Sequence, residues 1–228
     1  MLELKRLYLR LRANFGFLDW WPGDSKEEIV VGAILTQNTA WRNVELAIKN
    51  LKEKNMLSLE KLSLSDNKNI ETAIRPAGFY KQKTKRIKNL ACYILKRYSG
   101  LEKFFEKDIT ELREELLSLN GIGKETADSI ILYAADKPTF VIDAYTKRIM
   151  YRVYGIEEDI QYDELKRYFE NKIKKDLTVY KDFHAQLVEL GKRFCKKTPK
   201  CGECPIRDKC RYSSINLKMH QKINIKIV

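Results

Sequence analysis

The sequence lacks any apolar run that is long enough to cross a membrane. Its longest apolar runs, such as residues 29–35, are much shorter than the roughly 20 residues that a spanning helix needs. The first six residues also lack the hydrophobic segment of a secretory signal. We therefore expect an intracellular, cytoplasmic protein, and 228 residues with 44% hydrophobic content suffice for one large or two small domains.

Patterns typical of β-strands are missing as well, whereas helical spacing of apolar residues recurs along the chain. Ser25 and Glu28 have the spacing of a capping box, and the apolar segment after them is expected to be deeply buried. Asp143 is expected to open a later helix. The sequence thus predicts an all-α protein, with further helices at residues 2–15, 26–38, 41–54, 67–74, 82–98, 162–175 and 179–194.

Acidic residues are absent from residues 81–97, which contain seven lysines and arginines. Residues 193–228 hold ten basic residues against two acidic ones, and the whole chain has a net charge of +13. Solvated helix faces rich in lysine and glutamate are one explanation of such a composition. The clustering instead favours a polyanionic partner, and nucleic acid, here the DNA of the nucleoid, is the polyanion we expect.

Cysteine is scarce outside one short segment. Four of the five cysteines lie within sixteen residues in the spacing C-x5-C-x2-C-x5-C, namely Cys195, Cys201, Cys204 and Cys210. In an intracellular protein this packing indicates a metal site rather than disulfides. Zinc and an iron–sulfur cluster both accept four cysteines, and frequency alone favours zinc. The remaining thiol, Cys92, is expected in the core.

Residues 121–127 read Gly-Ile-Gly-Lys-Glu-Thr-Ala and lie between two segments with helical apolar spacing, the first of which we expect Thr110 to cap. Gly121 can adopt the positive φ that ends a helix. Gly123 lets the N–H groups that open the second helix approach an anion such as a DNA phosphate. An ordinary helix–turn–helix corner would show the same glycine pattern.

The residues around this turn carry a resemblance. The segment Leu-Asn-Gly-Ile-Gly at residues 119–123, a cation, Thr-Ala, and later Asp143 in Val-Ile-Asp resemble the helix-hairpin-helix motif of the endonuclease III superfamily of DNA glycosylases. The likeness covers about residues 1–211. It implies a monomer that acts on double-stranded DNA containing a damaged base. It also implies two helical domains with a central cleft, formed by residues 24–136 and by residues 1–23 with 137–228.

Asp143 is the catalytic residue that this resemblance implies. Breaking an N-glycosidic bond develops positive charge on the sugar, and a carboxylate in a low-dielectric cleft stabilises that charge and can orient water. Simple capping of the following helix is the alternative role, and one side chain can fill both.

A glycosylase that extrudes a nucleotide needs groups that fill the gap and groups that hold the backbone. By resemblance, Gln37 enters the vacated space and Phe79 wedges into the opposite strand. The alternatives are a polar helix end for Gln37 and a core position for Phe79. Phosphate contacts are implied for Gly121, Gly123, Lys124, Lys196, Lys197 and Lys200.

Relatives in this superfamily carry a similarly spaced [4Fe–4S] loop near the C-terminus. The resemblance therefore makes Cys195, Cys201, Cys204 and Cys210 cluster ligands, with five residues in the first gap where the relatives usually have six.

The resemblance also indicates the reaction type. Members that cleave the DNA strand have a lysine directly after the hairpin cation, and its amine forms a Schiff base. Glu125 occupies that position and cannot form an imine, so we expect a monofunctional enzyme.

The aromatic residues indicate the base. Trp20, Trp21 and Trp41 resemble the pocket of endonuclease III-like 3-methyladenine DNA glycosylases, although core packing is the alternative for the first two. A cationic alkylpurine gains about 0.5–2 kcal/mol of cation–π attraction on an indole face. Glu125 and Gln186 are assigned to the same pocket, and Gln186 stands where members of that branch place a functional lysine.

Two other functions stand against this one. The first is a bifunctional enzyme for oxidised pyrimidines, which Glu125 disfavours. The second is a non-enzymatic hairpin module that only binds DNA, which Asp143 and the cysteine loop disfavour.

Overall fold

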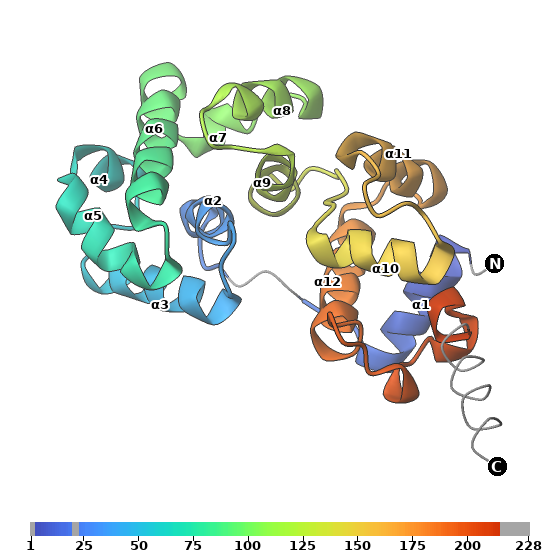
Figure 1. Ribbon diagram of the computed structural model, residues 1–228. Coiled ribbons are helices and arrows are strands. Elements are labelled where there is room, and N and C mark those ends of the chain that lie inside the picture. The colour runs from blue at the N-terminus through green and yellow to red at the C-terminus, as the bar shows by residue number, and fades with distance from the viewer. Residues whose placement is uncertain (1–2, 20–22, 215–228) are drawn as a thin grey trace, which may run out of the picture. The chain divides into compact units, whose positions relative to one another are not determined.

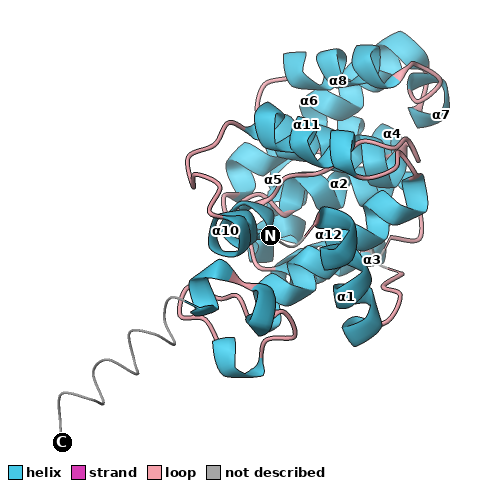
Figure 2. Ribbon diagram, turned by 90° about the vertical axis from the view of Figure 1, so that its right-hand side faces the viewer, coloured by secondary structure: helices cyan, strands magenta, loops and turns pink. Residues whose placement is uncertain are grey.

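The computed structural model describes residues 3–19 and 23–214, and every regular element in these ranges is helical (Figures 1 and 2). The all-α prediction is confirmed. None of the helices in these ranges is long and apolar enough to cross a membrane. The chain divides into two compact units, which we call the continuous unit (Trp21–Thr139) and the discontinuous unit (Met1–Trp20 with Phe140–Val228).

Helix α2 (Lys26–Leu35) forms the centre of the continuous unit. All of its residues from Val30 to Leu35 are buried, because this part of the helix is apolar on every face. It packs against α3 (Trp41–Glu53), α6 (Tyr80–Tyr98) and α9 (Lys124–Ser129) (Figure 1). The unit also contains α4 (Leu59–Leu64), α5 (Asn67–Ile74), the 3-10 turn η1 (Arg75–Ala77), α7 (Leu101–Phe104), α8 (Ile109–Ser118) and the π-helical turn η2 (Ile130–Ala134).

Helix α12 (Leu177–Arg193) has the same central role in the discontinuous unit, where it packs against α1 (Leu4–Phe15) and α10 (Ala144–Tyr154). Aromatic rings fill this core. Phe169 of α11 (Tyr162–Lys172) stacks on Phe140 with ring centroids 4.3 Å apart, and its ring lies 5.7 Å from that of Phe183 on α12. The turns η3 (Cys201–Glu203) and η4 (Arg207–Lys209) follow α12.

The helix ends correct three details of the sequence analysis. Only half of the capping box forms: Ser25 accepts a hydrogen bond from the N–H of Glu28, whereas the Glu28 carboxylate accepts one from the N–H of Asp24. Helix α8 is capped by Asp108 and not by Thr110, because the Asp108 carboxylate accepts from two N–H groups of the first turn. The helix after the hairpin is α-helical only to residue 129 and then widens into η2.

Two further expectations were wrong or incomplete. Cys92 is exposed on α6 rather than buried, because Ala91 and Ile94 form the buried face beside it. The short helices α4 and α7 were not predicted, since six and four residues are too few to display a helical period of apolar residues.

We expect Phe169→Ala to lower the free energy of unfolding by about 3–5 kcal/mol, because it removes a fully buried ring and leaves a cavity. Urea denaturation followed by circular dichroism measures this change. Leu64→Ala is the control: its side chain is 85% exposed, so its effect should stay within about 0.5 kcal/mol. Equal effects of the two substitutions would contradict the assignment of the core.

Candidate active site and DNA interface

Asp143 is the N-cap of α10 in the discontinuous unit. Its Oδ1 accepts a hydrogen bond from the backbone N–H of Thr146 at 2.7 Å, so the capping role is present. The side chain is only 12% exposed, and Val141 and Ile142 before it are buried. Capping therefore uses one carboxylate oxygen and fixes the orientation of the other in a sheltered position.

His184 of α12 faces this second oxygen. Its Nε2 lies 3.8 Å from Oδ2 of Asp143, which is beyond hydrogen-bond distance. Burial lowers the pKa of His184, while the negative charge of Asp143 acts in the opposite direction. Because the lowered pKa lies below the usual value of about 6.5, the imidazole ring is neutral at pH 7. Asp143 thus has a neutral, buried ring beside it rather than a cation.

The predicted hairpin lies in the continuous unit between α8 and α9. Gly121 adopts a φ of 86°, as expected from the sequence, and the N–H of Ile122 donates to the carbonyl of Leu119. Gly123 opens α9, and a Cβ atom added there would meet no atom within 4 Å. The approach to the backbone at Gly123 is therefore open. Lys124 and Glu125, the next two residues, are exposed.

Gln37 lies in the turn after α2, and its side chain reaches the hairpin. Its Nε2 donates to the carbonyl of Gly121 at 3.0 Å and to Oγ1 of Thr126 at 2.9 Å. Its Oε1 accepts a hydrogen bond from Arg86 of α6. The structure therefore brings two of the predicted DNA-contacting segments together, through a side chain that is bonded at both ends.

Phe79 precedes α6 and is 62% exposed, so the core alternative for this residue is wrong. Its backbone has a φ of 46° and a ψ of 30°, the left-handed conformation that non-glycine residues rarely adopt. Gly78 before it also has a positive φ, of 66°. Two consecutive residues with positive φ form a sharp turn that presents the Phe79 ring to solvent.

Trp41 is the first residue of α3 and lines a cavity of about 280 Å³ between α2 and α3. Its Nε1 donates to Oε1 of Glu45 at 3.0 Å. The other side chains around the cavity include Glu28, Lys49 and Lys52. The two remaining tryptophans of the predicted base pocket, at positions 20 and 21, lie outside the described residues.

Gln186 is fully buried in the discontinuous unit. Its Nε2 donates to the carbonyl of Gly16 at 2.6 Å and to Oδ1 of Asp182 at 3.1 Å, and the same Oδ1 accepts the N–H of Leu18. This polar pair on α12 therefore holds the chain segment that follows α1. Gly16, to which Gln186 donates, lies four residues before Trp20 in the sequence. The Gln186 side chain therefore bonds within the protein and does not face solvent.

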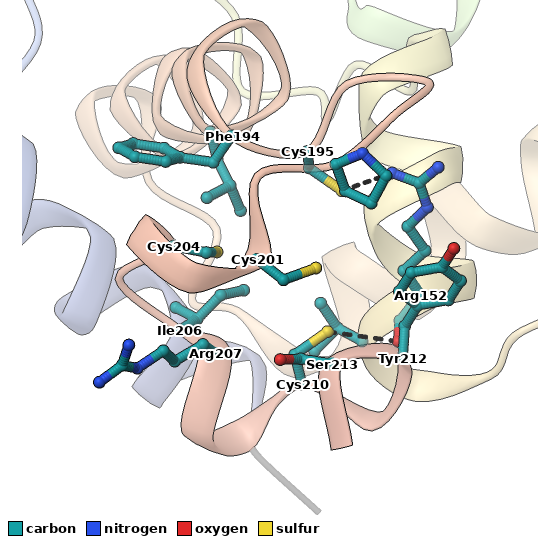
Figure 3. A pocket seen from close by; sticks show the side chains of 13 residues that line it. Arg152, Phe194, Cys195, Cys201, Cys204, Ile206, Arg207, Cys210, Tyr212 and Ser213 are labelled. Carbon is teal, nitrogen blue, oxygen red and sulfur yellow. Dashed lines mark hydrogen bonds between the residues drawn. The ribbon is translucent and has the colours of Figure 1, made fainter. Parts of the chain in front are cut away.

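The four clustered cysteines line one cavity together with Arg152 and Tyr212 (Figure 3). All four are free thiols, so no disulfide uses them. Among the described residues, no three His, Cys, Asp or Glu side chains converge on a single metal-ion position. Thiolates from four cysteines can hold either a zinc ion or a four-iron cluster, so the donor set fits both.

Hydrogen-bond donors point at these sulfur atoms. Nη1 of Arg152 lies 3.3 Å from Sγ of Cys195 (Figure 3), and the backbone N–H of Ile206 donates to Cys204. Burial, together with the nearby thiols, nevertheless raises the pKa of Cys204 to about 11. Donors of this kind stabilise thiolates and tune cluster potentials. The donor set and its surroundings therefore fit a thiolate-ligated cluster.

The lysines of the first cysteine gap, Lys196, Lys197 and Lys200, are exposed. Arg152 also donates to the backbone carbonyls of Lys196 and Lys197, at 2.6 and 3.0 Å, and Nε of Arg148 donates to the carbonyl of Cys195 at 2.7 Å. Helix α10, which is capped by Asp143, thus fixes the start of the cysteine loop.

Lys83 corrects the prediction of a basic surface at residues 81–97. It is 1% exposed, and its ammonium group is held by oxygen atoms inside the continuous unit. Burial, together with the positive charge of Arg86, lowers its pKa to about 8. Its position was visible in the sequence, because Lys83 shares the helical spacing of Ile87, Leu90 and Ile94, which are all buried.

Comparison with known proteins places these features in a family. Residues 31–175 match the family model described as HhH-GPD superfamily base excision DNA repair protein. A relative from Methanocaldococcus jannaschii, provisionally named a DNA repair glycosylase, is 49% identical over 207 residues, which cover 90% of this chain and 94% of the relative.

Two solved structures of DNA repair enzymes are similar to this chain. The H. pylori 3-methyladenine DNA glycosylase bound to 1,N6-ethenoadenine is 32% identical with a TM-score of 0.75, covering 84% of this chain and 98% of that one. A non-covalent endonuclease III–DNA complex is 21% identical and shows the same fold, with a TM-score of 0.81 over 96% of this chain and 100% of that one.

The family match extends over more than half of the chain and includes both the hairpin and Asp143. The resemblance to the endonuclease III superfamily is therefore confirmed, and the chain belongs to the HhH-GPD superfamily of base excision DNA repair proteins as a DNA N-glycosylase.

Proposed function

We propose that this DNA N-glycosylase removes alkylated purines of the 3-methyladenine type from double-stranded DNA without cleaving the strand. The observation that carries its hydrolytic chemistry is the sheltered Asp143 carboxylate, of which one oxygen caps α10. As the bond between base and sugar breaks, the other oxygen stabilises the positive charge on the sugar and orients the water that adds to it. Because the His184 ring is neutral, it does not offset the negative charge of the Asp143 carboxylate.

Trp41 supports a cationic base. Its indole lines the 280 Å³ cavity, with the Glu45 carboxylate bonded to its Nε1. Lys49 and Lys52 line the same cavity and balance the charges of Glu28 and Glu45. The indole face is therefore the feature of this cavity that favours a cationic base over a neutral one. The 3-methyladenine glycosylase with which this chain is 32% identical adds support for the same class of base.

Glu125 supports the monofunctional reaction. A Schiff base with C1′ of the sugar requires an amine at this position, and the carboxylate cannot supply one. Lys124, one residue earlier and exposed, is assigned to a DNA phosphate beside the open backbone at Gly123.

We further propose that Cys195, Cys201, Cys204 and Cys210 ligate a [4Fe–4S] cluster. Their donor type, their common cavity and the N–H groups directed at their sulfurs support this assignment. When bound, the cluster cross-links the loop that carries Lys196, Lys197 and Lys200. These lysines then approach the DNA backbone from a fixed loop.

A panel of lesion duplexes tests the substrate. We expect the protein to release 3-methyladenine, with strand breaks appearing only after alkali has cleaved the abasic sites. Trp41→Leu should lower this excision more than it lowers binding to an abasic-site duplex, because no base is present there to stack on the indole. Release of oxidised pyrimidines with direct strand cleavage would favour the bifunctional alternative.

Asp143→Asn tests the catalytic role, because asparagine caps helices about as well as aspartate but carries no charge. We expect excision to fall about a hundredfold or more, while affinity for damaged DNA is largely kept. Asp176→Asn is the matched control: Asp176 caps α12 through a 2.9 Å bond from the N–H of Val179. Similar turnover of both variants would leave Asp143 as a helix cap alone.

The cluster proposal predicts a brown protein with broad absorbance at about 400 nm. Cys201→Ser should remove most of this colour, whereas Cys92→Ser, at an exposed cysteine outside the loop, should keep it. Iron and zinc analysis completes the test. A colourless wild-type protein with one equivalent of zinc would overturn the assignment.

A further inference from the structure

The ammonium group of Lys83 connects the turns that carry Gln37 and Phe79. Its Nζ donates to the carbonyl of Leu35 at 2.8 Å, to Oγ1 of Thr39 at 2.6 Å and to the carbonyl of Ala77 at 2.8 Å. Leu35 ends α2 and Ala77 ends η1, so both carbonyls stand at helix ends. Helix-end carbonyls attract cations and need an outside donor. Lys83 supplies that donor to both ends at once.

The Phe79 turn follows directly after this contact. A left-handed conformation costs a non-glycine residue roughly 1–2 kcal/mol, and it persists only where surrounding contacts enforce it. Ala77, two residues earlier, is held by Lys83 and also accepts a hydrogen bond from Oγ1 of Thr39 at 2.5 Å. The exposed ring of Phe79 is thus presented by a turn that is tied to the segment containing Gln37.

Arg86 extends the connection to the hairpin. It lies one helical turn after Lys83 on α6 and donates to Oε1 of Gln37, whose Nε2 bonds the hairpin at Gly121 and Thr126. A Cβ atom at Gly121 would collide with the Arg86 side chain, so the arginine packs directly on the hairpin glycine. Three turns that are separate in the sequence are therefore joined by two cations of one helix.

We propose that Lys83 and Arg86 are positioning residues that hold the Gln37 turn, the Phe79 turn and the hairpin as one DNA-contacting unit, with Arg86 acting through Gln37. This inference rests on the proposed function, in which the three turns contact DNA. Lys83 is buried and Arg86 is half-buried, so the two residues serve the other contacts rather than the phosphates directly.

A double-mutant cycle between Arg86 and Gln37 tests the proposal. Single-turnover excision at saturating enzyme is measured for the wild type, Arg86→Met, Gln37→Ala and the double variant, using whichever lesion the wild type removes. We expect Arg86→Met to slow excision about tenfold in the wild-type background and less than about twofold in the Gln37→Ala background. Arg86→Lys should restore most of the rate, because lysine can still donate to the Gln37 oxygen.

Lys85→Met is the matched control, since it removes the same charge from an exposed position on the same helix. Its effect should multiply with that of Gln37→Ala, because the two side chains act independently. Thermal unfolding confirms that each variant is folded. If Arg86→Met slows excision by the same factor in both backgrounds, Arg86 does not act through Gln37 and the proposal is wrong.

A second measurement separates this inference from the proposed reaction. The fluorescence of 2-aminopurine placed opposite an abasic-site analogue reports local unstacking and needs no excision. Wild-type binding should change this fluorescence, and Arg86→Met should reduce the change at saturation while Lys85→Met keeps it. Lack of excision of every lesion would refute the reaction while leaving this test intact. An equal fluorescence change for Arg86→Met and wild type would refute the positioning role.

Discussion

Helix α2 is apolar on every face beyond its first turn, so it is stable only where other helices surround it. That constraint organises the continuous unit. Helices α3, α6 and α9 pack around α2, and α9 follows directly from the hairpin. The turn at the C-terminal end of α2 carries Gln37, which is therefore delivered to the hairpin by the packing of the core.

Burial of α2 also removes the carbonyls at its C-terminal end from water, and Lys83 donates a hydrogen bond to one of them. The last carbonyls of a buried helix cannot bond to water, and an unpaired one is costly. Lys83 reaches the carbonyl of Leu35, the last residue of α2, from α6 with its charge in the interior, and burial lowers its pKa to about 8 because desolvation disfavours the ammonium form. A buried cation of this kind ties several chain segments together at fixed distances.

The discontinuous unit uses a helix in a different way. Asp143 caps the start of α10, and arginines further along α10 hold the backbone at the first cysteine. One rigid helix thus links the carboxylate to the cysteine loop. The buried Asp182 and Gln186 of α12 fix the segment after α1 in a similar manner.

The sequence by itself determined the helical class, most helix positions, the hairpin with its positive φ at Gly121 and the family. These features depend on local spacing, on capping groups and on glycine conformations, which are set by neighbouring residues. Asp143 was identified as a candidate catalyst from the family resemblance and as a cap from its place before an amphipathic helix, and the cap is present.

Only the tertiary structure decided which groups the inward-pointing polar side chains bond to. Lys83 and Cys92 lie on the same helix, yet the lysine is buried and the cysteine exposed, because packing against α2, α4 and α5 buries one face of α6 whatever residue types it carries. The bonds of Gln37 to residues more than eighty positions away could not be predicted, since sequence spacing carries no record of long-range contacts. Tertiary packing gives Lys83, Arg86 and Lys88 hydrogen-bond partners within the protein, whereas the other basic residues of 81–97 remain exposed.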